Sequence, residues 1–160
     1  MRNTVKIASI GAAITATLAI STTPASAASY THTRLENVWS YKCLGTGSEK
    51  GSGAQLIQWT CDGSRDLRWT ITPTSGGYYT IKNDWSGKCM AVAGSAYGNG
   101  AKVIQWDCKG YEDQKWALSG SEIINAHSGK SVGVGSSKAN GAGAIQWTKG
   151  AGYDQLWGLS

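Results

Sequence analysis

The sequence predicts an all-β fold assembled from three copies of one unit. Three stretches share one order of residues: an aliphatic residue, Asn two positions later, Ser-x-Lys, then Ile-Gln-Trp and a closing Trp. The three Ile-Gln-Trp tryptophans are Trp59, Trp106 and Trp147, and each is followed ten residues later by its closing partner. Repetition at a fixed spacing is the signature of a repeat architecture. The three copies are residues 35–69, 81–116 and 123–157.

The composition and the local pattern both favour strands over helices. The chain has 22 Gly, two Pro, no Phe and eight Trp, and six of those Trp belong to the repeat frame. No long stretch has a helical period, whereas short apolar runs bounded by Gly, Ser, Asn and Asp recur. About four strands are expected in each repeat, giving a closed or nearly closed body, because one repeat cannot bury its apolar face alone. In the second repeat we expect strands at 78–83, 89–92, 102–106 and 116–118, and residues 30–33 lead into the first strand of the chain.

The first 27 residues have the pattern of a signal peptide. Arg2 and Lys6 precede an apolar run, and Ala25-Ser26-Ala27 is a small-residue cleavage site. Polar residues interrupt the run, which disfavours the alternative of a retained membrane anchor. We therefore expect a secreted chain of residues 28–160, one domain by size, without membrane insertion.

The charge distribution excludes a typical nucleic-acid interface. The 15 basic residues exceed the 10 acidic residues by five, and loss of Arg2 and Lys6 with the signal peptide leaves 13 against 10, a net charge of +3. The charges are scattered, with no basic run or basic helix. We expect no nucleic-acid partner.

The cysteines predict one disulfide in each of the first two repeats. In the third repeat, Ser131 and Lys149 stand at the two cysteine places, so both cysteines are missing together. Joint loss favours pairing within each repeat among the three possible connectivities, and each bond would contribute about 3 kcal/mol. A metal site would lack a close Cys/His pairing, so we expect no metal and no cofactor. The expected pairs are Cys43–Cys61 and Cys89–Cys108.

These motifs resemble those of the ricin-type β-trefoil lectin family, which includes plant toxin B chains and sugar-binding modules of bacterial glycoside hydrolases. The frame is S-G-K-C-[LM]-x-V, then N-G-A-x-V-I-Q-W-x-C, then D-Q-x-W. The Q-x-W signature is complete at Gln114-Lys115-Trp116 and Gln155-Leu156-Trp157 and degenerate at Leu67-Arg68-Trp69. The resemblance implies a β-trefoil over residues 28–160, in which six two-stranded hairpins form a short barrel and its cap. The repeats would span about 30–72, 78–119 and 121–160.

The closing tryptophans are expected to form a shared core, together with the aliphatic residues of the frame. The core set is Trp69, Trp116, Trp157, Leu35, Ile81, Ile123, Ile57, Ile104 and Ile145.

The Ile-Gln-Trp tryptophans have two possible roles. Side chains alternate along a strand, so an inward Ile would also place the Trp inward, where it would pack against the disulfide. The family instead places its sugar-stacking aromatic at this position. An indole that covers the C–H face of a pyranose buries about 60–80 Å², worth roughly 1.5–2 kcal/mol. The resemblance therefore implies that Trp59, Trp106 and Trp147 stack on sugar.

The polar half of a sugar site departs from the family pattern. The family's sugar-binding Asp in C-[LM]-D-V is replaced by Gly45, Ala91 and Gly133. A carboxylate beside each signature could accept from sugar hydroxyls instead, or could simply cap a turn. The signature glutamines would brace the repeat and also face the ligand. The candidate carbohydrate-binding residues are Trp106, Asp113, Gln114, Trp147, Asp154, Gln155, Trp59 and Asp66.

The second and third repeats are the more complete candidates, because the first has Leu67 where the others have Gln. Three tyrosines could extend the aromatic surface. An aligned trio in hairpin turns could either widen that surface or cover a hairpin. The tyrosines are Tyr97, Tyr111 and Tyr153, and the trio is Trp39, Trp85 and His127.

A binding function is favoured over catalysis. The sequence has no nucleophile elbow, zinc-protease motif or phosphate loop, and the adjacent acids Glu112 and Asp113 make a poor glycosidase pair. We expect a monomeric, secreted lectin, not an enzyme, that binds glycans or polysaccharides weakly at several sites. The alternative is a protein-binding trefoil, such as an inhibitor or toxin-like subunit, which the missing family Asp would favour.

Overall fold

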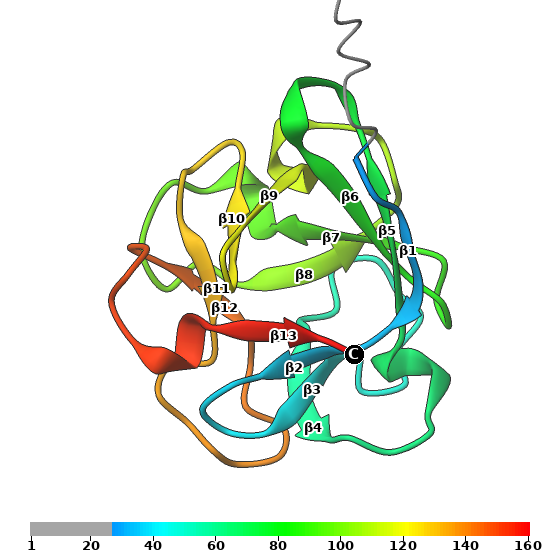
Figure 1. The fold of residues 1–160 in the computed structure, drawn as a ribbon, viewed down its shortest axis with the longest axis vertical. Helices are drawn as coiled ribbons and strands as arrows, with labels where there is room; N and C mark the ends of the chain where they lie inside the picture. Colours follow the sequence, from blue (N-terminus) through cyan, green and yellow to red (C-terminus); the bar gives the residue numbers. More distant parts are fainter. Residues whose placement is uncertain (1–26) are drawn as a thin grey trace, which may run out of the picture.

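The computed structural model describes residues 27–160, and thirteen strands run through them (Figure 1). The predicted signal peptide lies outside the described residues except for Ala27. The strands are β1 (Tyr30–Thr33), β2 (Leu35–Asn37), β3 (Lys42–Gly45), β4 (Ile57–Thr60), β5 (Trp69–Pro73), β6 (Tyr79–Asn83), β7 (Cys89–Val92), β8 (Val103–Trp106), β9 (Trp116–Ser119), β10 (Glu122–Asn125), β11 (Ser131–Gly133), β12 (Ile145–Trp147) and β13 (Trp157–Leu159).

The predicted all-β, three-repeat fold is confirmed. Each repeat contributes four strands: β2 to β5, β6 to β9, and β10 to β13. The four strands of the second repeat match the expected ranges to within one residue at each end. The segment Tyr30–Thr33 is a separate strand, β1, which pairs with β5.

Five short 3-10 turns complete the described structure. Three of them precede the last strand of a repeat and contain the Asp that comes just before the Q-x-W signature. The turns are η1 (Arg65–Leu67), η2 (Ser75–Gly77), η3 (Ala93–Ser95), η4 (Glu112–Gln114) and η5 (Tyr153–Gln155).

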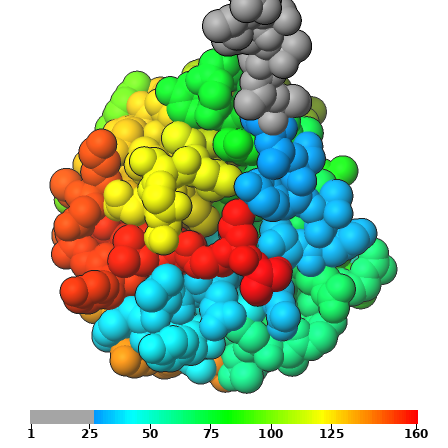
Figure 2. Space-filling view, viewed as in Figure 1, coloured from blue at the N-terminus to red at the C-terminus, as the bar shows by residue number. Residues whose placement is uncertain are grey.

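Pairing between repeats arranges the strands as a ring. The last strand of each repeat pairs with the first strand of the next, as β5 with β6, β9 with β10, and β13 with β2. The pairing is divided between a nine-stranded and a four-stranded sheet. The C-terminus returns to the start of the fold, where the Arg34 amide donates to the Ser160 carbonyl at 2.7 Å. Figure 2 shows these two ends, blue and red, in contact on one face.

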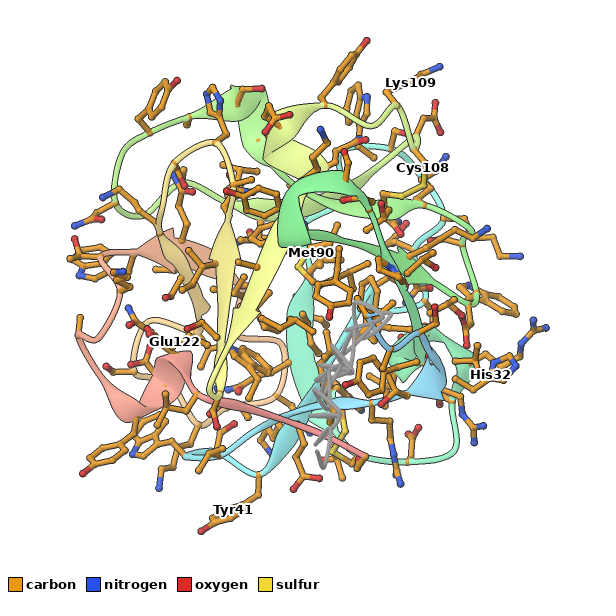
Figure 3. All side chains as sticks on the ribbon, turned by 45° about the horizontal axis from the view of Figure 1, so that its top comes forward. His32, Tyr41, Met90, Cys108, Lys109 and Glu122 are labelled. Carbon is orange, nitrogen blue, oxygen red and sulfur yellow. A yellow bond between two sulfur atoms is a disulfide. The ribbon has the colours of Figure 1, made fainter. Side chains whose placement is uncertain are left out.

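The closing tryptophans occupy the core, as predicted. Trp69, Trp116 and Trp157 are buried, and each indole Nε1–H donates to a backbone carbonyl of the same repeat, at 2.8, 3.0 and 2.9 Å. Met90 fills the interior between the repeats (Figure 3). Apolar residues from all three repeats complete the cluster: Leu35, Leu44, Leu56, Ile71, Ile81, Val92, Val103, Ile123, Val132, Val134 and Ala144.

The expectation that the Ile-Gln-Trp isoleucines join this core is wrong for Ile57 and Ile145. Ile57 and Ile145 are only half-buried, and Ile104 is buried but lies outside the core cluster. The residue before each of them takes the core place. Those core residues are Leu56, Val103 and Ala144.

The glutamine of Ile-Gln-Trp is the buried residue of that strand, and it joins one repeat to the one before it. Gln105 is fully buried, and its Nε2 donates to the carbonyls of Glu49 and Gly51 in the first repeat, at 2.9 and 3.0 Å. The other two glutamines make the same pair of bonds around the ring: Gln146 to Ala96 and Gly98, and Gln58 to Ser137 and Ala139.

The Asn and Ser of the repeat frame complete these links. Asn83 Nδ2 donates to the Asp66 carbonyl of the preceding repeat at 2.8 Å, while its Oδ1 accepts from the Trp85 and Ser86 amides. Two of the three frame serines donate to the buried glutamine at 2.7 Å, Ser40 to Gln58 and Ser128 to Gln146. The repeated residues are therefore chiefly the ones that connect the repeats.

Both predicted disulfides are present, Cys43–Cys61 and Cys89–Cys108, each with its Cα atoms 5.1 Å apart. In the third repeat a hydrogen-bonded clip takes their place. The Glu122 carboxylate accepts from the buried Ser131 hydroxyl and from the Gly150 amide, both at 2.8 Å.

Within residues 27–160, no helix has the length and apolar character needed to cross a membrane.

The glutamine links predict unequal costs for two equivalent substitutions. Gln146→Leu should lower the free energy of unfolding by about 2–4 kcal/mol, because the backbone carbonyls of Ala96 and Gly98 and the Ser128 hydroxyl lose a partner. Gln105→Leu should cost about 1 kcal/mol less, since its Oε1 already has no partner within the described residues. Urea unfolding at equilibrium measures both; a Gln146→Leu protein as stable as wild type would contradict the assigned role.

Candidate functional site

The alternation of the Ile-Gln-Trp strand places its Ile and Trp together on the outer face. The glutamines point inward and are fully buried, so the residues on either side of them point outward. From the sequence, alternation with an inward Ile favours an inward Trp, whereas the resemblance implies a Trp that faces a sugar. The side chain that turns inward is a polar one, and the six hydrogen bonds donated by Nε2 of Gln58, Gln105 and Gln146 make this burial favourable.

The outward tryptophans are equally exposed in all three repeats. Trp59, Trp106 and Trp147 expose 44%, 43% and 42% of their surface. A glycine in the long loop of the preceding repeat lies against each indole: a Cβ on Gly53 would meet the Trp106 ring at 3.4 Å, and one on Gly100 would meet Trp147 at 3.8 Å. Each indole thus rests on a neighbouring repeat while much of its surface stays open.

The cysteines and the positions of the missing family Asp share the face of these tryptophans. In the register, Trp59 lies opposite Cys43 and Ile57 lies opposite Gly45. The second repeat pairs Trp106 with Cys89 and Ile104 with Ala91, and the third pairs Trp147 with Ser131 and Ile145 with Gly133. Side chains opposite each other in an antiparallel pair point to the same face.

A pocket forms on this face in every repeat. Its volume is about 280 Å³ in the first repeat, 250 Å³ in the second and 370 Å³ in the third. Each pocket is lined by the outward Ile and Trp, by the Asp before the signature, and by a loop serine. The three sets are Ile57, Trp59, Asp66 and Ser48; Ile104, Trp106, Asp113 and Ser95; and Ile145, Trp147, Asp154 and Ser136.

The structure therefore brings together the predicted candidates of each repeat. The first repeat, expected to be the weakest, has a pocket with the same walls as the others, with Leu67 in place of the glutamine. The serines were not among the sequence candidates. Their signal was a Gly-Ser pair at the same place in each repeat: Gly47-Ser48, Gly94-Ser95 and Gly135-Ser136, all with positive φ.

The carboxylates hold the pocket loops. Asp66 Oδ2 accepts from the Ser48 amide and Asp154 Oδ2 from the Ser136 amide, both at 3.1 Å. These bonds reach across the pocket to the long loop, so neither carboxylate acts only on its own turn. In the described chain no such bond reaches Asp113, which lines the second pocket.

The same carboxylates occupy the space beside the missing family Asp. A Cβ on Gly133 would lie 3.1 Å from Asp154 Oδ2, and one on Gly45 would lie 3.3 Å from Asp66 Oδ2 and only 2.5 Å from the Leu67 side chain. At Gly45 a second carboxylate side chain would clash with Leu67, at Gly133 it would be tightly packed, and at both positions it would meet a like charge. The small residues and the acidic residues are therefore parts of one arrangement.

The signature glutamines brace the loop that follows each tryptophan. Gln114 Oε1 accepts from the Lys109 and Gly110 amides at 2.7 and 3.0 Å, and its Nε2 donates to the Asp107 carbonyl at 2.8 Å. Gln155 makes the equivalent bonds to Ala151 and Thr148. Both side chains are buried and still line their pockets, as the resemblance implied.

The aligned turn trio contacts the long loop of the preceding repeat in all three cases. Lys50 Nζ lies 3.8 Å from the centre of the Trp85 ring, and Lys138 Nζ lies 4.5 Å from that of Trp39. At the third position the rings of Tyr97 and His127 are 4.2 Å apart. Of the other tyrosines, Tyr111 lines the second pocket, and Tyr153 lines a separate hollow beside the third pocket.

One group of described residues approaches a metal-ligand arrangement, Glu36 with Cys43 and Cys61. Both sulfur atoms belong to the disulfide and offer no thiolate. The arrangement therefore suits structure and not metal binding.

Both the sequence and the fold are similar to those of known proteins. A family model described as ricin-type beta-trefoil lectin domain-like matches residues 22–106 and 73–147. The designed 3-fold symmetric protein ThreeFoil has a TM-score of 0.76 and 30% identity, over 80% of this chain and 96% of that chain. No curated protein matches the sequence.

Two natural proteins share the fold. The exo-beta-1,3-galactanase 1,3Gal43A from Clostridium thermocellum has a TM-score of 0.76 and 30% identity over 81% of this chain, but the match spans only 30% of the galactanase. The Rhizoctonia solani agglutinin has a TM-score of 0.71 at 20% identity, over 81% of this chain and 94% of that chain, and supports the fold alone.

The separation of core and surface indoles predicts opposite outcomes for two substitutions in the second repeat. Trp116→Ala should lower the free energy of unfolding by about 3–5 kcal/mol, because it opens a cavity in the core. Trp106→Ala should cost less than about 1 kcal/mol, because much of its ring is already exposed. Urea unfolding followed by circular dichroism compares them, and equal losses would contradict the assignment of Trp106 to the surface.

Proposed function

The chain belongs to the ricin-type beta-trefoil lectin domain-like family, and from this premise we propose that it is a secreted lectin that binds saccharides or polysaccharides at its three pockets. The observation that carries the proposal is the threefold recurrence of one combination. An open indole, an aliphatic floor and a carboxylate meet in one pocket at equivalent positions of every repeat. A sugar presents a C–H face and a rim of hydroxyls, which this combination matches.

The indole supplies affinity and the carboxylate supplies selectivity. Covering one sugar face with Trp59, Trp106 or Trp147 is worth roughly 1.5–2 kcal/mol. A hydroxyl that donates to a carboxylate adds about 1.5–3 kcal/mol where water is excluded. The free oxygen of Asp66 and of Asp154 takes this role, because the other oxygen already holds the loop serine.

The absence of the family Asp is compatible with this proposal, because another carboxylate lies beside its position. The carboxylates of Asp66 and Asp154 lie directly beside Gly45 and Gly133. They present negative charge to the pocket floor from the opposite wall. The acceptor for sugar hydroxyls is thus moved to another residue.

Each site is weak, and the three act together. Stacking with a few solvated hydrogen bonds gives about 4–6 kcal/mol, which corresponds to a Kd from roughly millimolar to tens of micromolar. Three pockets on one rigid body bind a polymeric or branched glycan more tightly by avidity. A polysaccharide surface is therefore the preferred partner.

Secretion is supported by the two disulfides, which persist in oxidising compartments. The signal-peptide pattern of the first 27 residues points the same way.

Binding without hydrolysis is supported by the carboxylates. Glycosidases pair a carboxylate with a protonated acid. The second and third pockets each have one lining carboxylate, and only the first has two, Asp62 and Asp66. Hydrogen bonds from Ser64 lower the pKa of Asp62, which keeps it ionised, the opposite of what a general acid requires.

The proposal predicts that wild-type protein is retained on at least one immobilised polysaccharide among galactans, xylans, glucans and mannans. Trp106→Ala and Trp147→Ala should each weaken retention about tenfold or more, through the lost stacking surface and the lost avidity. Affinity electrophoresis in gels that contain each polysaccharide measures this.

The matched control is Tyr41→Ala. Tyr41 is 74% exposed, points away from the body (Figure 3) and lines none of the three pockets. Its loss should leave retention unchanged while removing an exposed aromatic ring. Failure of wild type to bind any of the four polysaccharide classes would reject the lectin proposal and favour the protein-binding alternative.

A further inference from the structure

The pocket of the first repeat continues into a second hollow. A hollow of about 230 Å³ adjoins it and shares three of its lining residues, Ser48, Ser64 and Asp66. The remaining lining residues of this second hollow are Arg65 and Trp85. One carboxylate, that of Asp66, therefore stands between two tryptophans, Trp59 in the first hollow and Trp85 in the second.

Trp85 belongs to the second repeat, and backbone contacts fix it beside the first. The Asp84 amide donates to the Arg68 carbonyl at 2.9 Å, and Asn83 Nδ2 donates to the Asp66 carbonyl at 2.8 Å. The Trp85 amide in turn donates to Asn83 Oδ1 at 3.0 Å. The indole keeps 38% of its surface exposed, so it is available to a ligand.

Two cations without acidic partners flank this second hollow. Lys50 lies over the Trp85 ring, and Arg65 donates from Nη2 to the Asp84 carbonyl at 3.3 Å. Neither forms an ion pair with another described residue. The nearby Asp84 carboxylate is already engaged by His32 and Thr70, at 2.7 and 2.8 Å.

The other two repeats lack this combination. The place of Arg65 is taken in the second repeat by Glu112, which pairs with Lys115 at 2.6 Å, and in the third by Tyr153. The turn aromatic beside the second repeat is His127, whose ring is stacked on Tyr97. Only the first repeat, among the described residues, joins a turn indole to two cations that have no ion-pair partner.

We propose that the first repeat binds an oligosaccharide of at least two units, with one sugar on Trp59 and a carboxylate-bearing sugar on Trp85, facing Arg65 and Lys50. The Asp66 carboxylate accepts hydrogen bonds from hydroxyl groups of both units, because it lines both hollows. This inference rests on the proposed lectin function and adds a ligand class to it. An acidic sugar, such as a uronic acid, supplies a C–H face for the indole and a carboxylate for the two cations.

The experiment isolates the first repeat in a Trp106→Ala/Trp147→Ala background, which removes stacking in the other two pockets. Probes come in matched sets of a methyl glycoside, a neutral disaccharide and the same disaccharide with a terminal glucuronic acid, in a galactose series and a xylose series. Low-affinity isothermal titration calorimetry at fixed ionic strength measures each Kd.

The expected order is a gain in affinity from monosaccharide to neutral disaccharide, and a further gain with the acidic unit. Trp85→Ala should weaken binding of both disaccharides about tenfold and leave the monosaccharide unchanged. Arg65→Gln should weaken binding of the acidic disaccharide about three- to tenfold and leave binding of the neutral probes unchanged. Trp39→Ala, the equivalent turn residue beside the third repeat, is the matched control and should change none of these values.

Four failures are distinguishable. Equal affinity for monosaccharides and disaccharides, unaffected by Trp85→Ala, overturns the second subsite and leaves the lectin function intact. Equal affinity for neutral and acidic disaccharides, unaffected by Arg65→Gln, overturns the acidic ligand. Absence of binding to every probe by the double variant, while wild type is retained on a polysaccharide, overturns the site of the first repeat and leaves the lectin function intact. Absence of binding by wild type as well, together with no retention on any of the four polysaccharide classes, overturns the lectin function itself.

Discussion

The buried glutamine of each Ile-Gln-Trp strand constrains how the three repeats pack together. A primary amide has no place in an apolar core unless its donors and acceptor find partners. The side-chain Nε2 of each glutamine donates to two backbone carbonyls of the preceding repeat. Because these carbonyls belong to the long loop, the same bonds that satisfy the glutamine also fold that loop against the next repeat.

This constraint also divides the tryptophans by role. With the glutamine inward, the following Trp must point outward, while the closing Trp ten residues later returns to the core, where its Nε1–H is satisfied by a backbone carbonyl. The loop held by the glutamine supplies the glycine on which the outward indole rests. One polar contact thus orders a core, a loop and an open aromatic surface at once, three times around the ring.

The sequence predicts the fold well, because the repeat frame, the cysteine places and the closing tryptophans are local patterns that recur three times. It also predicts the Trp and Asp of each pocket, but it misses the loop serines and does not predict which side chains of the Ile-Gln-Trp strand point inward. Ile57 and Ile145 are more apolar than Gln58 and Gln146, and only partners about 50 to 80 residues away in the chain reverse the order of burial. The position of Trp85 near Asp66 likewise depends on hydrogen bonds between the first and second repeats, which cannot be inferred from the sequence of either repeat alone.

In the proposed lectin, three indoles face the ligand while three others are buried in the core. The most direct measurement is a titration with galactose- and xylose-based oligosaccharides that follows the indole N–H signals in ¹H–¹⁵N correlation spectra. We expect saturable shifts at Trp59, Trp106 and Trp147 and unchanged signals at Trp69, Trp116 and Trp157. Saturable binding that leaves the three outward indoles unshifted would contradict this expectation.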